Sequence, residues 1–250
     1  MGNKLKGKRL KVILCCYNWA GCQALKLLYD KGYDLFVYTS ESEYYIPSVI
    51  DYCKKLNIKY TTEKIQLENL PFKPDIICSI YYRYIISKDV IELCNGKIFN
   101  LHPALLPKYR GCSSLTWAMI NGEKNVGYTY HYIDSKIDNG RILIQKQIEL
   151  LPFDTQDTLY KRVMFEAMKD FNNAFQLVIK GFNGIKQIGT PTFYKRGCPY
   201  NGIINPEWNI EKIERFIRAM IAPPLPLCKY KTKDIHSLVE YINEKNKENL

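Results

Sequence analysis

Short apolar runs alternate with amphipathic segments along the first hundred residues. Four runs rich in β-branched and aromatic residues predict strands: residues 10–15, 34–39, 75–80 and 97–100. Apolar residues at helical spacing predict helices at 21–28, at 46–56 and after Ser87, a plausible N-cap. Strands that alternate with helices predict βαβ units, and hence an α/β fold whose parallel sheet has helices on both faces. Ligands of such folds bind outside the carboxyl ends of the strands, where the strand order reverses.

The second half of the chain has a different pattern. Residues 126–133 and 142–149 predict two antiparallel strands, joined by a loop with the turn Asp138-Asn139-Gly140. Residues 155–181 predict one long amphipathic helix. After about Ile188 aromatic residues, Gly and Pro dominate, and Pro223-Pro224-Leu225-Pro226 excludes regular structure. We therefore divide the chain into a main domain, 1–185, and a small subdomain, 186–250, which we expect to hold a β-hairpin and a helix.

Length and composition bound the class of protein. A chain of 250 residues, 46% of them hydrophobic, can bury a core, which excludes disorder and fibrous repeats. No apolar run reaches the roughly 18 residues that a membrane span needs, and the run 12–16 is too short for a signal peptide. Nine cysteines without a C-x2-C pair predict neither a zinc site nor a disulfide framework, so we expect a reduced, cytoplasmic protein.

The net charge of +11 leaves two interpretations open. One is a generally basic surface, and the other is an anionic partner such as a phosphorylated ligand, a folate or a nucleic acid. Neither G-x-G-x-x-G nor G-x-x-x-x-G-K-[ST] is present. The segment from Cys15 to Gly21 instead links the first strand to a helix, either as a loop facing an anion or as an ordinary turn.

The stretch Phe99 to Gly111, FNLHPALLPKYRG, carries the first candidate chemistry. Residues i and i+2 of a strand point the same way, so Asn100 and His102 project together from the strand's carboxyl end. Histidine is a side chain that titrates near neutral pH, and His102 has the amide donor of Asn100 beside it. Taken alone, His102 fits a hydrogen-bonded loop histidine better than a catalytic one.

A second signal follows at residues 126–140. Thr129 and His131 share one face of the predicted strand, and Asp138 follows His131 by seven residues. Asp-Asn-Gly by itself is also common turn chemistry.

Together these motifs resemble a known family. The pattern Asn-x-His-Pro-x-Leu-Leu-Pro-x-x-[Arg/Lys]-Gly, then Gly-x-Thr-x-His, then a step to Asp-x-Gly, is similar to formyltransferases that use N10-formyltetrahydrofolate. The resemblance runs from about residue 8 to 180 and is most specific in the central part. It implies a Rossmann-like, mostly parallel sheet and a catalytic domain at 1–185.

The resemblance also implies catalytic roles. His102 would be the general base or proton shuttle for an amine that attacks the formyl carbon. Asn100 would donate a hydrogen bond to the oxyanion that forms there, and Asp138 would orient and charge-balance His102. No metal is required.

The resemblance places the pterin of the folate against the loop that follows the strand 75–80, largely through backbone groups. We assign the folate contacts to Tyr81, Tyr82, Arg83, Ile85, Thr129, His131 and Asp134. The alternative for each aromatic residue is packing at the sheet edge.

The tail indicates the acceptor. Phe216-Ile217-Arg218-Ala219-Met220, followed shortly by Pro-Pro, is similar to a segment of nucleotide-sugar N-formyltransferases. Transfer-RNA formyltransferases usually add a barrel of roughly a hundred residues there. A pyrophosphate prefers Lys or Arg and a base prefers an aromatic face. We assign acceptor contacts to Trp19, Lys108, Tyr109, Arg110, Ser113, Tyr194 and Arg196. For each, surface charge or core packing is the alternative.

The sequence therefore predicts a sugar N-formyltransferase. Its acceptor would be the amine of a nucleotide-linked 4-amino-4,6-dideoxy sugar, dTDP-4-amino-4,6-dideoxyglucose first, for surface polysaccharide such as the O-antigen of lipopolysaccharide. We expect a homodimer paired by residues 186–250, and no nucleic acid or membrane as partner. Two alternatives stay open: another formyl acceptor, such as methionyl-tRNA or a UDP-amino sugar, and a non-catalytic folate- or nucleotide-binding protein.

Overall fold

The computed structural model describes residues 9–247, and its first half is a run of βαβ units. The strands are β1 (Lys11–Cys16), β2 (Asp34–Tyr38), β3 (Lys59–Thr61), β4 (Ile76–Ile80) and β5 (Ile98–His102). The helices between them are α1 (Asn18–Asp30), α2 (Val49–Leu56) and α3 (Lys88–Leu93), with the 3-10 turn η1 (Leu67–Asn69). The predicted elements are confirmed, and β5 continues to His102, two residues beyond its predicted end.

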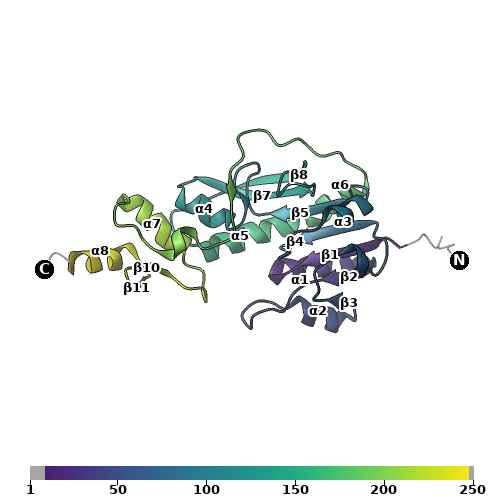
Figure 1. Ribbon diagram of the computed structural model, residues 1–250, viewed down its shortest axis with the longest axis horizontal. Helices are drawn as coiled ribbons and strands as arrows, with labels where there is room; N and C mark the ends of the chain where they lie inside the picture. The colour runs from purple at the N-terminus through teal and green to yellow at the C-terminus, as the bar shows by residue number, and fades with distance from the viewer. Residues whose placement is uncertain (1–8, 248–250) are drawn as a thin grey trace. The chain divides into compact units, whose positions relative to one another are not determined.

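The strands form one seven-stranded sheet. Its order is β3-β2-β1-β4-β5-β7-β8, where β7 is Asn125–Tyr132 and β8 is Ile142–Glu149, as Figure 1 shows. The pairs from β3 to β5 are parallel. β7 and β8 run in opposite directions, because Tyr132 N–H bonds the Arg141 carbonyl at one end and Leu150 N–H bonds that of Lys124 at the other. The strand order reverses between β1 and β4.

Helices cover both faces of the parallel strands. On one face Val90 and Cys94, in and just after α3, pack in a buried cluster with Ile13 and Ile77. On the other face α1 lies so close to β1 that a Cβ on Gly21 would be 3.0 Å from the Cβ of Cys16. The strands are buried on both faces, which explains why they read as continuous apolar runs. The predicted α/β class is confirmed.

The predicted single helix over 155–181 is wrong. The chain forms two helices, α5 (Gln156–Lys169) and α6 (Phe171–Ile179), separated at Asp170. Asp170 stands at the N-cap position of α6, with a ψ of −1°, and it is buried. Aspartate competes with the helix backbone for hydrogen bonds and therefore favours helix starts over interiors. The apolar spacing continues across the break, so periodicity alone did not reveal it.

The chain divides into two compact units, each built from several segments. Of the described residues, the first unit comprises 9–102, 130–144 and 168–186, and the second 103–129, 145–167 and 187–247. The last segment of the second unit begins next to the predicted domain boundary at 185/186, and that prediction stays a prediction.

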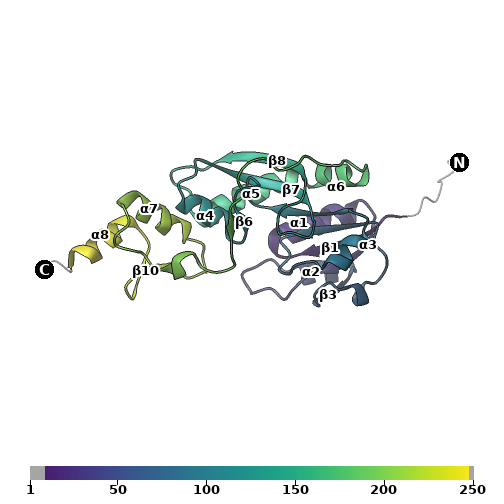
Figure 2. The same ribbon diagram turned by 45° about the horizontal axis from the view of Figure 1, so that its top comes forward.

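The second unit holds the remaining elements: β6 (Arg110–Gly111), α4 (Ser114–Ile120), β9 (Phe193–Tyr194), η2 (Pro199–Gly202), α7 (Ile210–Ala219), β10 (Cys228–Tyr230), β11 (Lys233–Ile235) and α8 (Leu238–Asn246). α4 packs on α7, and α7 contacts α8, as Figure 2 shows. The antiparallel pair β10–β11 followed by α8 is the expected hairpin and helix. No helix among residues 9–247 is long and apolar enough to cross a membrane.

Candidate active site

A cluster of polar side chains lies at the carboxyl ends of β4 and β5. Parallel register places Ser79 directly beside Asn100, and Asn100 and His102 lie on the same face of β5. His102 is only 5% exposed, although it ends a strand. The cluster therefore lies on the β4–β5 side of the point where the strand order reverses.

The loop between β7 and β8 brings Asp138 to this cluster. Asp138 has a left-handed backbone (φ 49°), and two residues later the chain passes so close to β7 that a Cβ on Gly140 would be 1.7 Å from the Tyr132 carbonyl oxygen. Asp134 shapes the loop, because its carboxylate accepts hydrogen bonds from Lys136 N–H and Asn139 Nδ2. The Asp-x-Gly motif thus has a conformational reason for its glycine.

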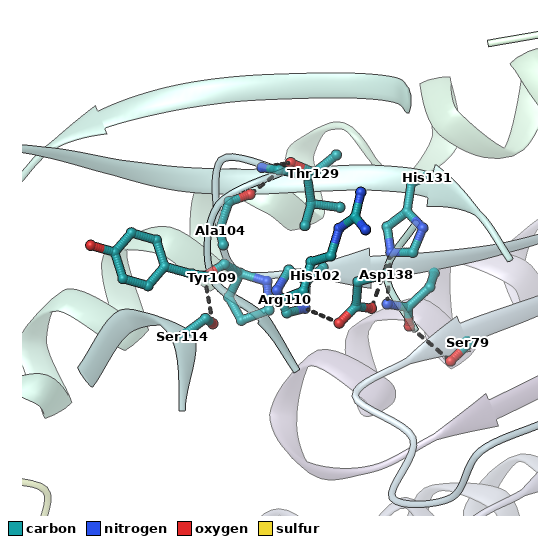
Figure 3. Close-up of polar contacts among 12 residues, drawn as sticks. Ser79, His102, Ala104, Tyr109, Arg110, Ser114, Thr129, His131 and Asp138 are labelled. Carbon is teal, nitrogen blue, oxygen red and sulfur yellow. Dashed lines mark hydrogen bonds and ion pairs between the residues drawn. The ribbon is translucent and has the colours of Figure 1, made fainter. Parts of the chain in front are cut away.

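Asp138 lies between two histidines. Its Oδ2 is 3.5 Å from His102 Nδ1, and its Oδ1 is 3.5 Å from His131 Nε2 (Figure 3). The side chains of His102, His131 and Asp138 are all largely buried. Since Nδ1 of His102 faces the carboxylate, Nε2 is the ring nitrogen on the opposite side.

Asn100 is held from two sides. Its Oδ1 accepts a hydrogen bond from Ser79 Oγ at 2.9 Å, and its Nδ2 is 3.2 Å from His131 Nε2. His131 Nδ1 is in turn 2.8 Å from the Tyr132 carbonyl oxygen. An amide N–H, an imidazole and a carboxylate therefore converge. This set can polarise a carbonyl and move a proton, as acyl transfer requires.

We also looked for groups of side chains that could bind a metal ion. No group of three or more His, Cys, Asp or Glu within residues 9–247 is placed to hold a metal ion.

The loop after β4 has mixed roles. Tyr82 packs against the buried cluster of α3 and its hydroxyl accepts from Ile65 N–H, so burial raises the pKa of its phenol. Arg83 lies over the ring of Tyr17 at 5.0 Å. Tyr81 has a left-handed backbone (φ 62°), and Ile85 is 69% exposed. Tyr82 has the contacts of a packing residue, whereas Ile85 is accessible to a ligand. These assignments to folate stay predictions.

Thr129, in the second unit, pins the loop that follows His102. Its buried hydroxyl donates to the Ala104 carbonyl at 2.6 Å and accepts from Leu106 N–H and from Gln145 Nε2. Gln145 also donates to the Leu106 carbonyl. Thr129 thus has a structural task beside its predicted role, and sequence reasoning missed Gln145.

Two of the predicted acceptor contacts, Lys108 and Tyr109, meet at Glu123. Lys108 Nζ and the Tyr109 hydroxyl lie 3.1 and 2.8 Å from Glu123 Oε1. Both residues line a cavity of about 430 Å³ in the second unit, between the loop 103–109, α4 and the start of β7. Asn100, His102 and Asp138 are not among its lining residues.

The Tyr194 ring stacks on Trp117 at 4.6 Å and on Tyr109 at 5.6 Å. Arg110 Nη2 donates to Gln187 Oε1, and its buried Nε has no partner among residues 9–247.

Backbone geometry and exposure place the other predicted acceptor residues. Tyr194 pairs with Gly111 where β9 meets β6, and a Cβ on Gly111 would be 2.2 Å from the Tyr194 carbonyl oxygen. Ser113 is the N-cap of α4 with φ 54°, and Arg196 is exposed. Trp19 lies in the first turn of α1, in the first unit.

Comparisons with known proteins agree with this geometry. The formyl transferase family model matches residues 20–174. The GDP-perosamine N-formyltransferase of Brucella melitensis biotype 1 is 38% identical over 175 residues, 68% of either protein. The bifunctional polymyxin resistance protein ArnA of Wigglesworthia glossinidia brevipalpis is 33% identical over 230 residues, 86% of this chain and 35% of ArnA.

Solved structures share the fold. WlaRD, a sugar 3N-formyl transferase solved in the presence of dTDP and 5-N-formyl-THF, has a TM-score of 0.80 at 23% identity, over 92% of this chain and 86% of WlaRD. A methionyl-tRNA formyltransferase from Clostridium thermocellum has a TM-score of 0.60 over 88% of each chain. The family model spans more than half of the chain and the Brucella relative two thirds, so this chain belongs to the formyl transferase family and is similar to its sugar N-formyltransferases.

Proposed function

We propose that this protein moves the formyl group of N10-formyltetrahydrofolate to the amine of a nucleotide-linked 4-amino-4,6-dideoxy sugar. The observation that carries the proposal is the convergence of Asn100, His102 and Asp138 at the ends of β5 and the β7–β8 loop. WlaRD and a Helicobacter canadensis N-formyltransferase were solved with formylated folates and with dTDP or a dTDP-amino sugar.

The proposed step is an acyl transfer. The amine nitrogen attacks the formyl carbon, and the carbonyl oxygen gains charge that an Asn100 N–H stabilises. His102 takes the proton that the amine loses, and Asp138 balances the imidazolium charge. The bond from carbon to the folate nitrogen then breaks, and the proton passes to that nitrogen. The products are a formamido sugar and tetrahydrofolate.

The nucleotide carrier has three candidates: dTDP, UDP and GDP. dTDP is the carrier that we favour, from the similarity of the segment around Phe216 to Met220 and from the dTDP-bound neighbours. UDP is the alternative that the sequence analysis left open, and GDP joins it because the relative at 38% identity is named for GDP-perosamine.

The test incubates the purified protein with N10-formyltetrahydrofolate and matched dTDP-, UDP- and GDP-linked amino sugars. Mass spectrometry would detect a product heavier by one carbonyl group. Formylation of a dTDP-linked 4-amino sugar is the expected result, and preference for a GDP-linked one would replace the carrier while keeping the reaction. Formylation of methionyl-tRNA alone would contradict the sugar acceptor, and absence of folate binding would contradict the reaction itself.

A further inference from the structure

A chain of hydrogen bonds runs through Asn100 from a side-chain hydroxyl to a backbone carbonyl. Ser79 Oγ is 2.9 Å from Asn100 Oδ1, Asn100 Nδ2 is 3.2 Å from His131 Nε2, and His131 Nδ1 is 2.8 Å from the Tyr132 carbonyl oxygen. All of these residues belong to the first unit. Ser79 carries no role in the proposed reaction so far.

The Tyr132 carbonyl sets which nitrogen of the His131 ring carries a hydrogen. The Tyr132 oxygen can only accept, so His131 Nδ1 carries a hydrogen. Asn100 Nδ2, which can only donate, lies 3.2 Å from the other ring nitrogen, His131 Nε2. Oδ1 consequently faces Ser79, whose hydroxyl donates to it.

The reversed amide would lose this match. Its oxygen, which can only accept, would face His131 Nε2, and both Nδ2 hydrogens would then lie on the Ser79 side of the amide. In the observed orientation one Nδ2 hydrogen binds His131. The second hydrogen, on the same nitrogen, is the one available to a developing oxyanion.

We propose that Ser79 is a positioning residue for formyl transfer: its hydroxyl binds Asn100 Oδ1, so that the donor Nδ2, and not the oxygen, is left for the developing oxyanion. The proposal rests on the role proposed above for Asn100. Ser79 itself touches neither substrate in this scheme and acts only through the amide.

The first test is Ser79→Ala. We expect kcat to fall about tenfold, which is the kinetic equivalent of one hydrogen bond, while KM for folate and for the acceptor stays within about twofold. Ser79→Thr keeps the hydroxyl in a strand and should retain most of kcat. Thr39→Ala is the matched control, because Thr39 is a buried hydroxyl just after β2 without a partner among residues 9–247, and its removal should leave kcat unchanged. Thermal unfolding of each variant reports loss of folding separately.

A double-mutant cycle with Asn100→Ala decides the mechanism. If Ser79 acts only through Asn100, Ser79→Ala has no further effect on kcat when Asn100 is already Ala. A kcat for Ser79→Ala within twofold of wild type, no rescue by Thr in a folded variant, or an additive loss in the double variant would overturn the inference. Full activity of Asn100→Ala alone would instead overturn the proposed function, so the two failures are distinguishable.

Discussion

Two side-chain clusters of this protein are built on different physics. The polar cluster of the first unit, Ser79, Asn100, His102, His131 and Asp138, is held by directional bonds and charge. The aromatic cluster of the second unit comprises Tyr109, Trp117, Tyr194, Tyr200 and Trp208. In this cluster the ring centroid of Trp117 lies 4.6 Å from that of Tyr194 and 5.3 Å from that of Tyr200. Lys212 Nζ lies 4.3 Å from the ring centroid of Trp208.

The two clusters should therefore respond differently to amino-acid substitutions. A hydrogen-bond chain changes its chemistry when one donor becomes an acceptor, whereas ring packing depends mainly on buried area and shape. We therefore expect substitutions in the polar cluster to change turnover with little effect on stability. Substitutions in the aromatic cluster should change stability first.

The largest effect should come from the polar cluster. His102→Ala and Asp138→Ala are each expected to lower kcat by roughly 10² to 10⁴-fold, because each removes part of the proton-transfer pair. Initial rates of product formation by mass spectrometry measure this. Losses below tenfold in both variants would show that neither residue has the assigned role.

The aromatic cluster should respond in the opposite way. Trp117→Ala is expected to lower the free energy of unfolding by about 3 kcal/mol, because a large ring is lost from between Tyr194 and Tyr200. Denaturant titration measures it, with Ile188→Ala, an 85% exposed side chain of the same unit, as the near-neutral control. An unfolding free energy equal to that of the control would remove the contrast between the clusters.

The smallest effect concerns the polar edge of the aromatic cluster. Burial raises the pKa of the Tyr109 phenol above its ordinary value of 10.0. Above about pH 10 the unfolded chain loses the Tyr109 proton, whereas the folded chain keeps it until the pH reaches the raised pKa. The stabilisation that the neutral, buried phenol gives is therefore fully present below about pH 10 and is lost as the pH rises through the pKa of the folded state.

Tyr109→Phe removes this group. It should cost about 1 kcal/mol near neutral pH, through the lost bond to Glu123, and should flatten the decline of stability above about pH 10. Unfolding curves at several pH values provide the check. An unchanged alkaline slope would count against a buried, neutral phenol.

Much of the fold was predictable because the signals are local. β1, β2 and β4 are apolar runs bounded by turns, and α1 ends just before Gly32, whose φ is 70°. The division of 155–181 into α5 and α6 was not predictable from spacing, because the apolar face continues past Asp170. β6 and β9 are two residues each and exist only because distant segments pair.

The candidate site shows the same limit. Asn100, His102 and Asp138 were named from motifs, and the fold places all three in one cluster. Ser79 was not named, since a serine in an apolar strand has no pattern of its own. Only the register of β4 against β5 sets it beside Asn100.

The class of sheet, the family and the three candidate catalytic residues, Asn100, His102 and Asp138, could be predicted from local sequence alone. Alternation, strand periodicity and short motifs are properties of neighbouring residues, and they survive without coordinates. Tertiary structure decided which hydroxyl holds the Asn100 amide and which carboxylate oxygen faces each histidine. It also decided that Tyr82 packs in the core while Ile85 is exposed. Those outcomes depend on strand register, loop closure and burial, which join residues that are distant along the chain.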